Sequence, residues 1–135
     1  GCRSSDRGMT QLPGTRGNAG FAFAAATGLG FALWSLAPWL VNRREPWDAE
    51  GPFYSLSLVL GTGAIAWWQP SRLAAAYLGA WLGQVLALVV LPWHQDGWLP
   101  LGAVTTGFGS LFALVGAALG SALRRAWPPS SGGAA

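Results

Sequence analysis

The chain has 135 residues, of which 52% are hydrophobic and only 10% are charged, with a formal net charge of +3. Soluble domains carry about 25% charged residues, so this composition disfavours a water-soluble fold and favours a membrane protein. All eight basic residues are arginines that stand singly or in pairs, which provides no basic face for nucleic acid. The single cysteine, Cys2, excludes an internal disulfide and a cysteine-based metal site.

Four stretches contain no Asp, Glu, Lys or Arg: residues 17–42, 51–71, 73–95 and 97–123. Each has about 20 residues or more, which is the length that a helix needs to cross ~30 Å of hydrocarbon. Transmembrane strands would alternate apolar and polar residues, whereas these stretches are continuously apolar. The sequence therefore predicts an all-α, polytopic integral membrane protein with four transmembrane helices.

The elements are predicted in chain order as a tail, four spans and a second tail. Residues 1–18 are polar and glycine-rich and are expected to be flexible. The transmembrane domain, residues 19–123, follows, and residues 124–135 form the second flexible tail. The four spans are predicted at about 19–41, 53–69, 73–91 and 99–123.

Prolines mark the ends of the predicted spans. Pro52 and Pro100 suit the first turn of a helix, while Pro70 and Pro92 stop the preceding helix. The connection around Pro70 is so short that spans two and three must be antiparallel. We expect the four spans to form two antiparallel hairpins.

The arginines predict the orientation. With a cytoplasmic N-terminus, six of the eight arginines lie inside, and only Arg43 and Arg44 lie outside. Four of the five acidic residues then lie outside. Seven of the nine tryptophans fall near span ends, as in an interfacial belt, while Trp34 and Trp81 lie deeper. These patterns predict a multi-pass protein of a bacterial-type inner membrane with both termini in the cytoplasm.

Small residues recur on one face of two spans. In the fourth span they are Gly102, Thr106, Gly109, Ala113, Gly116 and Gly120, and in the third span Ala76, Ala80, Gly83 and Ala87. Helices associate in lipid where small side chains let their backbones approach. We therefore expect spans three and four to pack against each other through these two faces.

One amide, Gln84, lies near the centre of the third span. An unpaired amide is costly in hydrocarbon, so we expect it to bond a serine, a threonine or a carbonyl of another span. The alternative is a ligand or pore contact, in which Gln84 would line a path with Thr62, Thr105 and Thr106. The spans carry no ionisable residue away from their ends, which argues against a proton-coupled pump.

The outer loops hold the remaining candidates for chemistry. If the two loops meet, Asp48, Glu50, His94 and Asp96 could surround a cation or supply a general acid and base. Their spacing matches no recognised ligand motif, so no metal site and no cofactor are predicted. Nucleotide-binding and hydrolase motifs are likewise absent from an appropriate context.

These features favour a non-enzymatic accessory or structural subunit that packs with itself or with a larger membrane complex. Its expected partners are the lipid bilayer and other membrane subunits, with no nucleic acid. Two alternatives stay open: a small channel or transporter subunit for a neutral or small solute, and a metal-binding or enzymatic site on the outer face.

Overall fold

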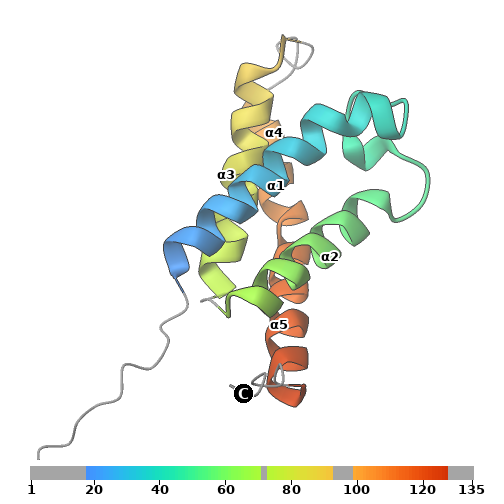
Figure 1. Ribbon diagram of the computed structural model, residues 1–135. Coiled ribbons are helices and arrows are strands. Elements are labelled where there is room, and N and C mark those ends of the chain that lie inside the picture. Colours follow the sequence, from blue (N-terminus) through green and yellow to red (C-terminus); the bar gives the residue numbers. More distant parts are fainter. Residues whose placement is uncertain (1–17, 71–72, 93–98, 128–135) are drawn as a thin grey trace, which may run out of the picture.

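The computed structural model describes residues 18–70, 73–92 and 99–127, and these ranges contain helices and no strand. The helices are α1 (Ala19–Leu40), the short 3-10 helix η1 (Pro46–Asp48), α2 (Phe53–Trp68), α3 (Leu73–Val90), α4 (Leu99–Gly109) and α5 (Leu111–Ala126) (Figure 1). The predicted all-α class is confirmed. The four predicted spans correspond to α1, α2, α3 and the run formed by α4 and α5.

Three of these helical stretches are long and apolar enough to cross a membrane. They are α1, α3 and the run Leu99–Ala126, whereas α2 has only 16 residues. The predicted tail of residues 1–18 lies outside the described residues, except for Asn18. The second tail was predicted to begin at residue 124, but α5 continues to Ala126, so Arg124 and Arg125 belong to its last turn.

Local chemistry explains several helix ends. The Asn18 side chain accepts hydrogen bonds from the amides of Gly20 and Phe21, which is the usual way to cap the start of a helix. Pro70 follows the end of α2 because the residue before a proline avoids helical geometry. The guanidinium Nη1 of Arg124 donates to the carbonyl oxygens of Trp67, at 2.7 Å, and of Trp68, so it caps that end of α2.

The fourth helical run is interrupted at Ser110, between α4 and α5. The Ser110 hydroxyl donates to the carbonyl oxygen of Thr106, four residues earlier, at 2.7 Å. Such back-bonding bends helices, and the neighbouring Gly109 weakens the helix at the same point. The Ala113 amide then bonds the Ser110 carbonyl at 2.9 Å, in the tighter three-residue pattern.

The most extensive helix contacts join α1 to α3 and α2 to α5. In each pair the residue numbers of the contact partners rise together, so the two helices run in the same direction. Figure 1 shows α1 crossing α3 and α2 crossing α5. Contacts between consecutive helices are less extensive, and the organisation into two antiparallel hairpins stays a prediction.

The expected packing of span three on span four is therefore wrong as the main contact. The small face of α3 lies on α1: a Cβ atom on Gly83 would overlap the carbonyl oxygen of Thr27. The small face of α5 lies on α2, where Cβ atoms on Gly116 and Gly120 would overlap the carbonyl oxygens of Val59 and Gly63. The spacing identified faces that pack closely, but it carried no information about which helix each face meets.

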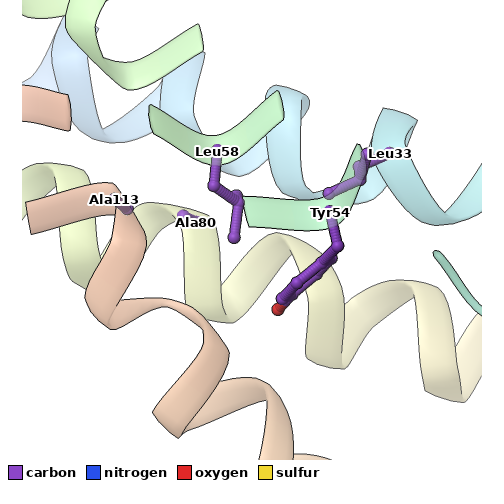
Figure 2. Packing of buried hydrophobic residues seen from close by; sticks show 5 residues of the cluster. All are labelled: Leu33, Tyr54, Leu58, Ala80 and Ala113. Carbon is purple, nitrogen blue, oxygen red and sulfur yellow. The ribbon is translucent and has the colours of Figure 1, made fainter. Parts of the chain in front are cut away.

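One cluster of the buried core joins side chains from four helices. Figure 2 shows the cluster of Leu33, Tyr54, Leu58, Ala80 and Ala113, which come from α1, α2, α3 and α5. The ring of Tyr54 extends from α2 into the space between α3 and α5, with its hydroxyl at the far end (Figure 2). The aromatic side chain thereby brings a polar group to the centre of the bundle.

The close approach of α1 and α3 predicts opposite effects for two glycine substitutions. Gly83→Ala is expected to lower the free energy of unfolding by about 1–3 kcal/mol, because its methyl group must displace the backbone of α1. Gly28→Ala on α1 is the matched control, since no heavy atom lies within 4 Å of its added Cβ. That change is expected to raise stability by up to about 1 kcal/mol through helix propensity. Thermal or denaturant unfolding in a mild detergent measures both, and equal effects would contradict the assigned contact.

Candidate functional site

A fully buried amide, Gln84, lies at the centre of the bundle and makes four hydrogen bonds. Its oxygen accepts from Trp34 Nε1 at 3.1 Å and from the Tyr54 hydroxyl at 2.5 Å. Its nitrogen donates to Ser110 Oγ at 2.8 Å and to the Ala80 carbonyl oxygen at 3.3 Å. An amide has two acceptor and two donor positions, so this side chain has a partner for each of them.

The four partners come from all parts of the bundle. Trp34 is on α1, Tyr54 on α2, Ala80 on α3 and Ser110 between α4 and α5. Their chemistry also fixes the orientation of the amide, because an indole N–H only donates and a carbonyl oxygen only accepts. The predicted bond from Gln84 to a serine of another span is present, and the same amide joins the pair α1–α3 to the pair α2–α5.

Two threonines extend the buried polar interactions. The Thr62 hydroxyl on α2 lies 2.6 Å from the carbonyl oxygen of Leu58 and 3.0 Å from that of Ala113 on α5. The Thr106 hydroxyl bonds the carbonyl oxygen of Gly102 within its own helix, at 2.9 Å. Both side chains are fully buried. These hydroxyls thus bond to the protein backbone.

An aromatic side chain from the α1–α2 loop covers one side of the amide network. The Trp47 ring, in η1, meets the Trp34 ring edge to face with centroids 4.6 Å apart, and the Tyr54 ring at 6.2 Å. The Trp47 indole N–H donates to the Glu45 carboxylate at 2.5 Å. Trp47, one of the seven tryptophans predicted near span ends, is half-buried against the rings of Trp34 and Tyr54.

The predicted polar contact residues do not form one set. Gln84, Thr62 and Thr106 are buried, whereas Thr105 is exposed and bonds carbonyl oxygens of its own helix, Leu101 and Gly102. Sequence reasoning paired neither Trp34 nor Tyr54 with Gln84. The available signal was that both aromatics carry a donor and that Trp34 lies deeper than the other tryptophans of the first helix and its loop.

The predicted small-residue positions lie at helix contacts, most closely with α1 and α2 and to a lesser extent between spans three and four. The buried members are Ala76, Ala80, Gly83, Ala87, Thr106, Ala113, Gly116 and Gly120. Gly102 and Gly109 are partly exposed, and Cβ atoms added there would meet the side chains of Leu88 and Tyr54.

The loop candidates for chemistry are only partly described. Asp48 and Glu50 are exposed in the α1–α2 loop, while His94 and Asp96 lie outside the described residues. Within the described ranges, no group of three His, Cys, Asp or Glu side chains is placed to hold a metal ion. Glu50 lines an open surface pocket of about 510 Å³ together with Arg43, so the charges on its walls are balanced.

No known family model matches the chain, and no curated protein or solved structure is significantly similar to it.

The amide network predicts a coupling between Gln84 and Tyr54. Tyr54→Phe is expected to lower the free energy of unfolding by about 1 kcal/mol, because it removes one buried hydrogen bond. Gln84→Leu is expected to lower it by more than about 2 kcal/mol, because a buried hydroxyl loses its acceptor and the other bonds of the amide are lost.

In the Gln84→Leu background, Tyr54→Phe should no longer destabilise the protein, because the hydroxyl then has no amide to bond. Unfolding of the four proteins of this double-mutant cycle in one detergent gives the coupling energy. Additive effects of the two changes would contradict a direct bond between these side chains.

Proposed function

We propose that the chain is a non-enzymatic integral membrane protein of a bacterial-type inner membrane, and that it serves as an accessory or structural subunit. Its four spans form two antiparallel hairpins, and both termini lie in the cytoplasm. It packs with copies of itself or within a larger membrane complex.

The observation that carries this proposal is the distribution of polar and apolar side chains. The buried residues are mostly small, and they include Gln84, Thr62, Thr106 and Ser110. Most of the large apolar side chains are exposed, for example Leu60, at 68%, and Phe108, at 71%. Similarly exposed apolar side chains occur on every long helix, among them Leu36, Leu40, Leu56, Val89, Val90, Leu101, Val104, Val115 and Leu119. Such an apolar exterior favours a lipid environment over water.

The short helix α2 also fits a bilayer when its ends are considered. Sixteen residues at about 1.5 Å each span about 24 Å, less than the ~30 Å of a typical hydrocarbon core. Trp68 is exposed at one end of α2, and Arg124 bonds the carbonyls there. Tryptophan and arginine are side chains that anchor a helix at the interface, and local thinning accommodates the remaining mismatch.

A subunit role is preferred to a pore because of how the buried polar groups are used. The side chains of Gln84, Thr62 and Thr106 bond to protein partners. A conducting path would need such groups to face water or solute instead. Thr105, the fourth residue of the hypothetical path, points to the exposed side of α4.

Cysteine labelling tests the membrane topology. In a Cys2→Ala background, Glu50→Cys lies in the exposed α1–α2 loop and Ala126→Cys at the exposed end of α5. A membrane-impermeant maleimide added to spheroplasts is expected to label Glu50→Cys, and to label Ala126→Cys only after lysis. The reversed pattern would overturn the orientation, and labelling of both without lysis would overturn the proposed span arrangement. Labelling in denaturant controls for the reactivity of each thiol.

The subunit role predicts that the purified chain is not a stable monomer. Native mass spectrometry after extraction in a mild detergent is expected to show a homo-oligomer or a stoichiometric complex with other membrane proteins. A monomer that persists across several mild detergents, without a co-purifying partner, would contradict this role.

A further inference from the structure

A pocket of about 440 Å³ opens at the end of the bundle where α2 and α5 end and α3 begins. We call it the Arg124 pocket. Its lining residues are Pro70, Leu73, Ala118, Ser121, Arg124 and Arg125. Two of these six carry a positive charge and none is acidic. The pocket lies away from η1 and the Gln84 network, at the opposite end of α2.

Ser121 contributes a buried hydroxyl to the lining of this pocket. Its Oγ atom is buried, yet it has no hydrogen bond within the described part of the chain. The buried hydroxyls of Thr62, Thr106 and Ser110 each bond a backbone carbonyl of an earlier turn. A buried hydroxyl left unpaired is unfavourable, so one that lines a pocket suggests that a ligand supplies its acceptor.

The two arginines present further donors around the pocket. Arg124 bonds the carbonyls of Trp67 and Trp68 through Nη1, which fixes its side chain with only one of its three guanidinium nitrogens. Arg125 is exposed beside it. Leu73 is the first residue of α3, and the amides of a first helical turn carry a partial positive charge. The pocket therefore combines two cations and a hydroxyl donor at a helix start.

We propose that the Arg124 pocket binds a phosphate group, supplied by the headgroup of an anionic phospholipid. Guanidinium groups match phosphate oxygens in geometry and charge, and a serine hydroxyl donates to the same oxygens. Basic pockets between helices at the cytoplasmic interface are suited to such headgroups. Pro70, Leu73 and Ala118 supply an apolar lining for the glycerol and the start of an acyl chain. The lipid source rests on the proposed membrane function, which places this pocket at the cytoplasmic interface.

Lipid binding by the full chain in a neutral detergent tests the pocket. Native mass spectrometry measures the retention of added phosphatidylglycerol and, separately, of phosphatidylcholine. The wild-type chain is expected to retain phosphatidylglycerol preferentially. Arg125→Gln is expected to weaken that binding about fivefold, which is the usual effect of one basic side chain near an anionic lipid. Ser121→Ala should weaken it without a change of charge.

Arg44→Gln is the matched control, because it removes one exposed arginine from the α1–α2 loop at the other end of the bundle. It is expected to leave phosphatidylglycerol binding unchanged. Far-ultraviolet circular dichroism confirms that each variant keeps its helix content. Equal binding of phosphatidylglycerol by the wild type, Arg125→Gln and Ser121→Ala overturns the proposal, and so does an equal loss in Arg44→Gln.

A second arm distinguishes the source of the phosphate. Inorganic phosphate is titrated while the melting temperature is followed, with chloride at equal ionic strength as the control. If phosphate raises the melting temperature only when Arg125 and Ser121 are present, and the chain shows no preference for phosphatidylglycerol, the phosphate site stands. Its ligand is then a soluble phosphate and not a lipid headgroup.

Flotation with pure phosphatidylcholine vesicles tests the membrane proposal separately. If the chain fails to float, that proposal fails, while the phosphate titration still decides the pocket.

Discussion

The fold depends on one constraint: an amide placed where no water reaches it must find all of its hydrogen bonds in the protein. Gln84 meets this constraint with donors from Trp34 and Tyr54 and acceptors from Ala80 and Ser110. Trp34, Tyr54 and Ser110 lie outside α3, so their bonds to Gln84 fix how the helices are placed relative to one another. Apolar contacts alone are weakly directional, so the amide supplies the specificity that they lack.

The glycines and the amide network depend on each other. Gln84 reaches Trp34 because the backbones of α1 and α3 approach closely, with Gly83 against the Thr27 carbonyl. In the same way, Gly116 against the Val59 carbonyl brings α5 close to α2. Small residues allow two helix backbones to approach closely, but they do not determine which two helices pack together. The most extensive contacts lie within the two pairs, α1–α3 and α2–α5. The bonds from Gln84 to Tyr54 and Ser110 join one pair to the other.

The sequence allowed good prediction of the helices and poor prediction of their partners, for physical reasons. Charge-free stretches predict helices because a charge is costly within a span. The same criterion wrongly ended the last helix before Arg124 and Arg125, which lie in its final turn, where arginine is favourable. The small faces of α3 and α5 were assigned to each other, whereas Gly30 on α1 meets α3 and Gly63 on α2 meets α5. It was predictable that Gln84 needs hydrogen-bond partners. That Tyr54 is one of them was not predictable, because the periodicity of the sequence does not show that its ring extends from α2 to α3.

The two ends of the bundle differ in a way that bears on function. At the η1 end, Trp47 packs on Trp34 and Tyr54, so the network is covered by the chain itself. At the opposite end, the buried hydroxyl of Ser121 has no hydrogen bond among the described residues, and Arg125 is exposed. Because the central polar groups already have partners within the fold, they are poorly placed to act on a solute. Within the described residues, hydrogen-bond donors and apolar surface remain available at the Arg124 end and on the perimeter, which is where the proposed lipid and subunit contacts would lie.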